Sequence, residues 1–421
     1  MTGDVRDRRI ARMGRLNAFV RSPAIRRELP LLVGLLFGAL LLVGVGAIDK
    51  RSDEVLGSDF SGFWAGARTV LEGRDVYDGV AFRDATLRLG TQVPDRDVFT
   101  YPPYVTAFLL PFALLPLSSA AALWTVGGLL ATVVGLRALL HTYMPAMPSA
   151  HVLVGFLALG SQSAVLTFVG GQWSFWLIGA WSAVAVGLRG AGQGRAGAAA
   201  ALLLVKPQLA VLGLLGVARR VSDPCRPRFL LGFVVAIVGL GAMSLYGGLN
   251  PWVEWMVSVP AARSAEPRVT TLPAALFDLI GAAGPLTSLV LLLVAVGFVW
   301  KFSDEDASFA LWLAVSLTFA IYSRSYDHLQ LLVPLVIGAS AVMRRSRRAA
   351  FWLMFAGTLV LVAGGWVLFQ VVAPARQSES FGAFVPAGIL LLLMAFLWSA
   401  RNLNVQRPCQ AAVSRDRQRT Q

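Results

Sequence analysis

Asp59 is the first of three positions at which an ionisable side chain stands against an apolar or aromatic stretch of sequence. It opens the segment Asp59-Phe-Ser-Gly-Phe-Trp-Ala-Gly-Ala-Arg, which follows a long apolar block. A carboxylate here could cap a helix by accepting hydrogen bonds from free backbone N–H groups. It could equally act at a membrane surface as a general base that activates a hydroxyl group. The residue type alone leaves both roles open.

The second position is the run Tyr322-Ser-Arg-Ser-Tyr-Asp-His, which lies between two strongly apolar blocks. Tyr and Arg at such a place can simply anchor a helix at headgroup depth. The presence of Arg324, Asp327 and His328 within one short run favours the wall of a polar pocket instead. A cation at this depth suits a phosphate whose lipid tail stays in the bilayer. His328 could orient Asp327, bind phosphate or donate a proton.

Lys206 is the third position, near the middle of the apolar run Ala-Leu-Leu-Leu-Val-Lys-Pro-Gln-Leu-Ala. A cation within the membrane is costly, so it normally faces a polar cavity or has a partner. Pro207 breaks the helix at this point and frees backbone groups, which suits a binding site. The alternative is a lysine that reaches the interface from a helix end.

Three further side chains are weaker candidates for substrate binding. Tyr101 belongs to Phe-Thr-Tyr-Pro-Pro-Tyr, Gln172 to Gly-Gly-Gln-Trp, and Trp64 to the aromatic segment after Asp59. Aromatic and amide groups suit sugar binding, but Trp is also a common interface anchor. The sequence has no phosphate-binding glycine loop, no nucleophile elbow and no metal-ligand spacing, so it indicates neither a metal nor a cofactor.

The composition places the chain in the membrane class. Its 421 residues are 56% hydrophobic and only 14% charged, and the mean hydropathy is +0.66, whereas soluble domains carry about 25% charged residues. The net charge of +14 does not indicate nucleic-acid binding, because the arginines gather at the termini and in particular loops. Those are the places where the positive-inside rule expects them.

The apolar blocks predict an all-α protein of about 12 membrane spans. With the basic N-terminus inside, most arginine clusters fall in the cytoplasm, but Arg137, Arg189 and Arg195 would lie outside. The short block 104–117 is the weak point, because a partial helix there would invert the middle of the topology. The blocks lie near 30–48, 104–117, 118–137, 151–169, 172–188, 196–218, 229–249, 285–300, 307–322, 329–343, 350–372 and 383–400.

This pattern predicts a basic cytoplasmic N-terminus over 1–29, one transmembrane domain over 30–402 and a basic cytoplasmic tail over 403–421. Two stretches, 49–103 and 250–284, are too long for simple connectors and are expected to be functional external loops. In the first loop, Phe60, Phe63, Trp64 and Ala67 share one helical face. The spacing predicts a short amphipathic helix that lies along the membrane surface.

Taken in order along the chain, these motifs resemble glycosyltransferase family 87, the polyprenol-phosphate-dependent membrane transferases of the GT-C fold. The family includes the mannosyltransferase that acts on phosphatidylinositol mannosides, and the similarity spans roughly residues 30 to 345. Arg324 departs from the pattern, because many relatives have a proline there. The matching motifs are Asp59-Phe, Trp64-Ala-Gly-Ala, Gly73-Arg-Asp-Val-Tyr77, Tyr101-Pro-Pro, Gly171-Gln172, Lys206-Pro207 and Tyr326-Asp-His328.

The resemblance implies a polyprenyl-phosphate hexose donor, with mannose expected, and a glycolipid or glycan acceptor at the outer face of the bacterial cytoplasmic membrane. Asp59 matches the family's general base in an inverting transfer. Lys206, Arg324 and His328 would bind the donor phosphate, and no nucleotide sugar or metal is implied. The residues expected to bind substrate are Tyr101, Gln172, Asp327 and Trp64.

Two other functions fit the same residues. A transporter or flippase of lipid-linked sugars would use the same surface aromatics and phosphate-binding cations. A non-catalytic scaffold of envelope assembly would need none of the ionisable residues. Charged residues distributed through the spans, or an internal repeat, would favour a transporter, and neither is evident.

Overall fold

The computed structural model describes a helical protein, and no strand occurs in the part of the chain that it describes, which confirms the predicted all-α class. Most of the predicted N-terminal segment, parts of both long loops and the side chains of the predicted tail fall outside that part. The described residues are 23–48, 58–89, 99–190, 192–221, 226–247, 250–264 and 269–419.

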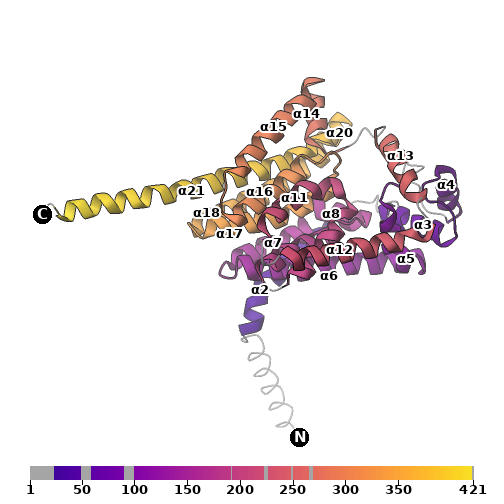
Figure 1. Ribbon diagram of the computed structural model, residues 1–421, viewed down its shortest axis with the longest axis horizontal. Helices are drawn as coiled ribbons and strands as arrows, with labels where there is room; N and C mark the ends of the chain where they lie inside the picture. The colour runs from indigo at the N-terminus through magenta and orange to yellow at the C-terminus, as the bar shows by residue number, and fades with distance from the viewer. Residues whose placement is uncertain are drawn as a thin grey trace, which may run out of the picture.

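The helices run mostly along one common direction (Figure 1). In chain order they are α2 (Pro23–Ile48), α3 (Ser58–Leu71), α4 (Gly79–Arg88), α5 (Pro103–Ala113), α6 (Leu117–Tyr143), α7 (Pro148–Gly160), α8 (Gln162–Gly170), α9 (Ser174–Arg189), α10 (Gln193–Leu202), η2 (Leu203–Val205), α11 (Pro207–Arg220), α12 (Arg226–Met243), η3 (Ser244–Gly247), α13 (Asn250–Ser264), α14 (Leu272–Ile280), α15 (Ala283–Trp300), α16 (Glu305–Thr318), η4 (Ser325–Leu331), α17 (Leu332–Met343), α18 (Arg347–Leu359), η5 (Val360–Gly364), α19 (Gly365–Val367), η6 (Leu368–Val372), α20 (Ala373–Arg376), η7 (Ser380–Ala383) and α21 (Phe384–Arg419).

Five helical stretches in the described ranges are long and apolar enough to cross a membrane, and a sixth results if the bent pair α7 and α8 is one span. The predicted count of about 12 is therefore not confirmed. Several predicted blocks correspond instead to shorter apolar helices. The five stretches are Leu117–Tyr143, Ala283–Trp300, Ser325–Met343, Arg347–Arg376 and Ser380–Asn402.

The block 104–117 forms only the short helix α5, which has 11 residues. At 1.5 Å per residue it is roughly 16 Å long, about half the thickness of a hydrocarbon core. The next helix, α6, begins after Pro116 and is 27 residues long. The block is therefore a partial helix, and the topology of the middle of the chain changes accordingly.

The block 196–218 is also not a single span, because the chain turns back at Lys206. Pro207 has no backbone N–H, and Lys206 leaves the helical region at φ −127° and ψ 73°. Helix α10 packs against α9 and α12, whereas α11 packs against α16. The chain thus forms a helical hairpin with Lys206 at its tip.

Both ends of this hairpin meet at the buried carboxylate of Asp306. Arg189, just before the hairpin, donates to Asp306 Oδ2, and Arg220, at its end, lies 2.7 Å from Oδ1. Arg344 also donates to Oδ2, at 2.8 Å. The prediction that Arg189 lies on the opposite side from the arginine cluster at Arg344 is therefore wrong. The side of Arg189 was predicted wrongly because the blocks that form α5 and the hairpin were each counted as one full crossing of the membrane.

Helices α10 and α12 approach so closely that only glycine fits between them. A Cβ atom added to Gly197 would lie 2.0 Å from the carbonyl oxygen of Phe229, and one added to Gly232 would lie 2.0 Å from that of Gly194. Small residues at a membrane helix interface let two backbones pack closely where hydrophobic driving force is weak.

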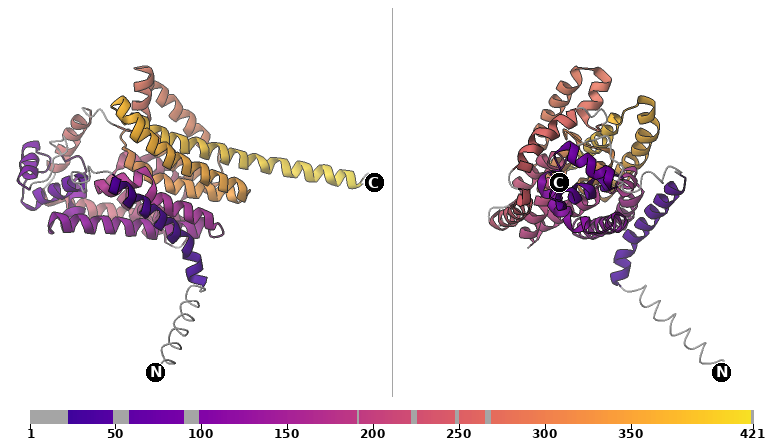
Figure 2. Two further views of the ribbon diagram at one scale, coloured as in Figure 1. Left: turned by 180° about the vertical axis from the view of Figure 1, so that it is seen from behind. Right: turned by 90° about the vertical axis from the view of Figure 1, so that its right-hand side faces the viewer.

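Helices α3 and α4 of the first predicted loop and α13 of the second gather at one end of the bundle, whereas α14 of the second loop lies beside α15 (Figures 1 and 2). Helix α3 is the predicted amphipathic helix. Its aromatic face is buried against protein, however, because Phe60, Phe63 and Trp64 are at most 7% exposed. This face packs on α5 and α6, and the position of the helix along the membrane surface stays a prediction.

The close approach of α10 and α12 gives a first prediction. Gly197→Ala should destabilise the protein by about 1–3 kcal/mol, because the added methyl group forces the two backbones apart. Gly239→Ala, in the partner helix α12, is the matched control, since nothing lies within 4 Å of its added Cβ. The midpoint of thermal unfolding in detergent should fall for the first variant and hold or rise for the second. Equal midpoints would contradict the packing.

Candidate functional site

The centre of the candidate site is a buried ion pair between the hairpin tip and η4. The Nζ atom of Lys206 donates to Oδ1 of Asp327 at 2.7 Å, and the two side chains are 3% and 1% exposed. The same ammonium lies 4.6 Å from the ring centroid of Tyr326. The sequence expectation of a partnered lysine is met, because a buried cation without a counter-charge would be very costly.

The turn before η4 fixes the carboxylate of Asp327. Its Oδ2 atom accepts a hydrogen bond from the backbone N–H of Arg324 at 3.1 Å. Its Oδ1 atom lies 3.4 Å from the hydroxyl of Ser174, which donates to it from the first turn of α9. Both oxygens are therefore engaged, and the orientation of Asp327 is set before any ligand binds.

Asp59 connects to this pair through Gln172. The Gln172 amide donates from Nε2 to Oδ2 of Asp59 at 2.5 Å and accepts at Oε1 from Lys206 at 3.5 Å. Asp59 lies within the first turn of α3 and is partly buried. A continuous polar chain thus runs from Asp59 through Gln172 and Lys206 to Asp327.

The two glycines before Gln172 make this contact possible. Gly171 has a left-handed backbone with φ +64°, and a Cβ atom there would lie 2.7 Å from Cβ of Phe60. A Cβ atom on Gly170 would lie 3.3 Å from Oδ2 of Asp59. Any larger residue would push α3, and with it the carboxylate of Asp59, away from Gln172.

Trp64 and Tyr101 pack among the buried side chains around α3. The indole N–H of Trp64 donates to the carbonyl of Leu115 at 3.0 Å, so it joins α3 to the turn before α6. The Tyr101 ring meets Phe63 edge to face at 5.0 Å, and its carbonyl accepts from the Tyr77 hydroxyl at 2.6 Å. The two predicted sugar-binding aromatics therefore hold the shape of the region around Asp59.

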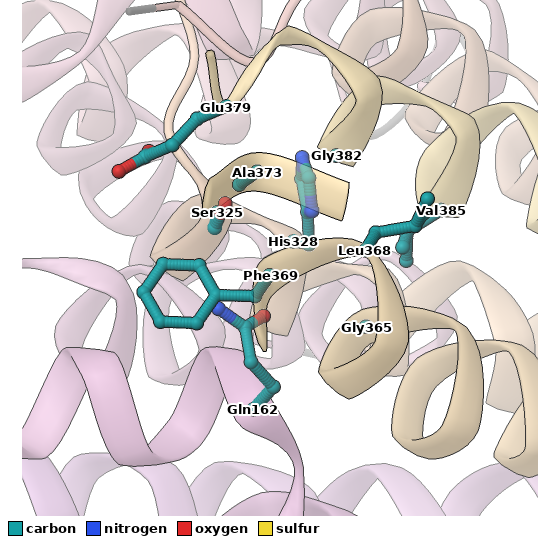
Figure 3. A pocket seen from close by; sticks show the side chains of 10 residues that line it. All are labelled: Gln162, Ser325, His328, Gly365, Leu368, Phe369, Ala373, Glu379, Gly382 and Val385. Carbon is teal, nitrogen blue, oxygen red and sulfur yellow. The ribbon is translucent and has the colours of Figure 1, made fainter. Parts of the chain in front are cut away.

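His328 faces a separate cavity, shown in Figure 3. Neither its Nε2 atom nor the Nε2 atom of Gln162 has a hydrogen-bond partner within the described part of the chain, although both residues are buried. Arg324 approaches the same cavity through Glu379, with the charged groups 3.8 Å apart. The residues that line the cavity are Gln162, Ser325, His328, Gly365, Leu368, Phe369, Ala373, Glu379, Gly382 and Val385.

The cavity has a polar wall and an apolar wall. Gln162, Ser325 and His328 face it from α8 and η4, whereas Leu368 and Phe369 face it from a stretch of wider, π-type helix. Such π-type turns often mark functional sites. The helix that supplies the apolar wall crosses the outside of the bundle, and only 17% of its most apolar part is buried.

Sequence analysis missed several residues of the site. Ser174 directly follows the Gly-Gly-Gln-Trp motif, and Gln162 is an amide inside an apolar block, so both had a signal in the sequence, whereas Glu379 had none. Within the described ranges, no three His, Cys, Asp or Glu side chains gather so that they could hold a metal ion.

Two carboxyl groups meet at the loop end of the bundle, where Glu254 of α13 contacts Asp75 in the loop between α3 and α4. The Glu254 side chain is hydrogen bonded to that of Asp75, and Asp78 adds a second negative charge. The hydrogen bond, desolvation and these charges together raise the pKa of Glu254 to about 7. Trp255 lies beside this contact and donates to the carbonyl of Thr100 at 3.3 Å.

The comparison with known families gives one match. The model for glycosyltransferase family 87 matches residues 99–323, more than half of the chain. This range includes Gln172 and the whole α10–α11 hairpin with Lys206 at its tip, and it ends just before Arg324. No curated protein and no solved structure matches the chain.

The buried ion pair gives a second prediction. Lys206→Met and Asp327→Asn should each destabilise the protein by about 3–5 kcal/mol, because each leaves one buried charge without a partner. The double variant should lose clearly less than the sum of the two, since it buries no charge. Unfolding in detergent measures all three. Additive losses would contradict the pairing.

A matched control is Arg74→Gln, which removes one partner of an ion pair with Asp84. These side chains are 44% and 59% exposed. The loss for this variant should stay below about 1 kcal/mol, because water already solvates both charges.

The carboxyl pair gives a third prediction, which concerns pH. The pKa of Glu254 is raised from 4.5 to about 7, so its stabilising contribution is complete below pH 4.5 and is lost as the pH rises through about 7. Glu254→Gln should remove this part of the pH dependence of the unfolding midpoint. Identical pH profiles for the variant and the parent would contradict it.

Proposed function

The chain belongs to glycosyltransferase family 87, and we propose that it transfers a hexose, namely mannose, from a polyprenyl-phosphate donor to a glycolipid or glycan acceptor. The observation that carries this proposal is the position of Asp59. Its carboxylate lies at the loop end of a membrane-embedded bundle and is linked through Gln172 to the pair of Lys206 and Asp327.

In the proposed reaction, Asp59 acts as the general base. The acceptor hydroxyl gives its proton to the Asp59 carboxylate while its oxygen forms a bond to the anomeric carbon of the donor sugar. The bond from that carbon to the phosphate oxygen breaks, and the polyprenyl phosphate leaves with both electrons. Attack opposite the leaving group inverts the configuration. General-base assistance of this kind contributes roughly 10²–10⁴-fold to the rate.

Helix α3 supports this role of Asp59. The carboxylate stands in the first turn of the helix, at the end that carries the positive pole of the helix dipole. Its hydrogen bond from Gln172 leaves the other carboxylate oxygen to receive a proton. A capping role would place Asp59 before the helix, whereas the helix already begins at Ser58.

The donor phosphate is proposed to bind where Arg324 and His328 approach the cavity of Figure 3. The charge of Lys206 is already offset by Asp327. Lys206 is therefore proposed to interact only with the donor phosphate oxygens that come closest to it. Arg324 lies 3.8 Å from Glu379 and donates from Nε to the Tyr322 hydroxyl at 3.3 Å, and its guanidinium is proposed to bind the phosphate. Developing charge on the leaving phosphate is then stabilised by fixed cations.

The apolar wall of the same cavity suits the isoprenoid chain of the donor. Leu368, Phe369 and Val385 line it next to a helix that is largely exposed to lipid. A lipid chain could therefore leave the cavity sideways into the bilayer. Among the other predicted substrate-binding residues, Gln172 and Asp327 position Asp59 and Lys206, while Tyr101 and Trp64 shape the surrounding wall.

We place the loop end of the bundle at the outer face of the bacterial cytoplasmic membrane and both termini in the cytoplasm. The support is the distribution of charge. Arg189, Arg220 and Arg344 meet at the end opposite Asp59, which is where the positive-inside rule expects basic residues on the cytoplasmic side.

Asp59→Asn is the test of this function. Transfer of labelled mannose from polyprenyl-phosphate mannose to a glycolipid acceptor should fall by about 10²–10⁴-fold, because Asn cannot accept the proton. Purified protein in detergent and mass spectrometry of the products measure it. Asp78→Asn is the control, because Asp78 caps α4 and Asn caps helices equally well. It should keep the parent rate.

Undiminished transfer by Asp59→Asn would overturn the assignment of the base. A protein that moves lipid-linked sugars across vesicles with this variant unimpaired, and shows no transfer, would be a flippase. Normal complementation by a variant with Asp59, Lys206 and His328 all replaced would indicate a scaffold instead.

A further inference from the structure

We propose that the end of the bundle opposite Asp59 holds a binding site for the phosphate and glycerol group of an anionic phospholipid. A cavity of about 160 Å³ lies there between α16, α17 and α21. This inference does not depend on the proposed transferase function. The residues that line the cavity are Phe302, Ser303, Asp304, Ala307, Ala341, Arg345, Leu397, Ala400 and Arg401.

The cavity lies at the depth of lipid headgroups. Three candidate membrane spans end beside it, at Trp300, Met343 and Asn402. The span that begins at Ser325, next to the candidate active site, is 19 residues long. It carries the chain roughly 28 Å to this end, close to the full thickness of a hydrocarbon core.

The rim of the cavity is typical of a membrane interface. Trp300 and Trp398 are 62% and 40% exposed, and each lies within two residues of a lining residue in the chain, Phe302 and Leu397 respectively. Trp side chains at this depth lie at the level of the headgroups. The guanidinium of Arg401 lies 5.5 Å from the Trp398 ring, so the cation and the aromatic belt occupy the same level.

The charge at the cavity favours an anion. Arg345 and Arg401 line it, and the carboxylate of Asp304 is already engaged by two hydrogen bonds from Arg344, at 2.8 and 2.6 Å. Arg401 also donates to the carbonyl of Lys301 at 3.1 Å, which holds its side chain at the rim. Two guanidinium groups thus face the cavity while its one acidic group is neutralised. Guanidinium groups recognise phosphate with paired hydrogen bonds.

The floor of the cavity identifies a lipid rather than a free anion as the occupant. Phe302, Leu397 and Ala400 are buried apolar residues at its base. An inorganic phosphate would gain nothing from this surface, whereas the glycerol and the first carbons of the acyl chains would cover it. The cavity volume of about 160 Å³ suits a phosphate with part of the glycerol.

A lipid bound here would add a further link between the ends of three spans, which already pack through α15, α16, α17 and α21. Ligand binding to the folded state alone stabilises that state in proportion to the logarithm of the ligand concentration above its dissociation constant. The site would therefore make the stability of the bundle depend on the content of anionic lipid in the membrane.

The test uses the full chain, purified in neutral detergent, with phosphatidylglycerol or phosphatidylcholine added. Phosphatidylglycerol should raise the unfolding midpoint and remain bound in native mass spectrometry, and phosphatidylcholine should do neither. Arg345→Gln should weaken phosphatidylglycerol binding several-fold, and Arg345→Gln with Arg401→Gln at least tenfold. Arg348→Gln, an exposed arginine outside the cavity, is the matched control and should bind as the parent does.

Three results would overturn the proposal. Equal stabilisation by the two lipids would show that no anion is recognised. Unchanged phosphatidylglycerol affinity in Arg345→Gln, whose exposed side chain can be replaced without loss of packing, would place the lipid elsewhere. Full competition by millimolar inorganic phosphate would identify the occupant as a soluble anion.

Discussion

The ion pair between Lys206 and Asp327 is the constraint on which the rest of the site depends. Two opposite charges that are 3% and 1% exposed cannot separate inside the bundle without a large cost. The pair therefore fixes the tip of the α10–α11 hairpin against η4. Gln172 takes its position from Lys206, and Asp59 takes its position from Gln172. The position of the proposed base, Asp59, thus depends on Lys206 and Asp327, which lie far from it in the sequence.

A buried ion pair is a poor way to stabilise a membrane protein, because apolar residues of equal volume would often do as well. We therefore propose that the pair is kept for its role in function. The aromatic packing of Phe63, Trp124 and Trp173 holds α3 rigidly over the pair. The site is thus preorganised. Ionic and hydrogen-bond contacts position the side chains from Asp59 to Asp327, and aromatic contacts position the wall around them.

The sequence predicted the individual groups better than their arrangement. Lys206 and Asp327 were identified because ionisable residues are rare in apolar blocks, and α3 was predicted from its helical spacing. The pairing between them could not be predicted, since it joins positions 121 residues apart. The hairpin was mistaken for one span because apolar composition does not distinguish a crossing from two short helices that turn back. Asp306 was overlooked because each arginine was assigned to a side of the membrane independently.

The central claim is that Asp59, set by Gln172 and the buried ion pair, is the base that faces the reacting carbon. A cryo-EM structure of the full chain with a non-transferable phosphonate analogue of polyprenyl-phosphate mannose and a glycolipid acceptor tests it most directly. We expect the acceptor hydroxyl to lie about 3 Å from the Asp59 carboxylate, with the phosphonate near Arg324 and His328. A sugar bound away from Asp59, with that carboxylate still closed against Gln172, would contradict it.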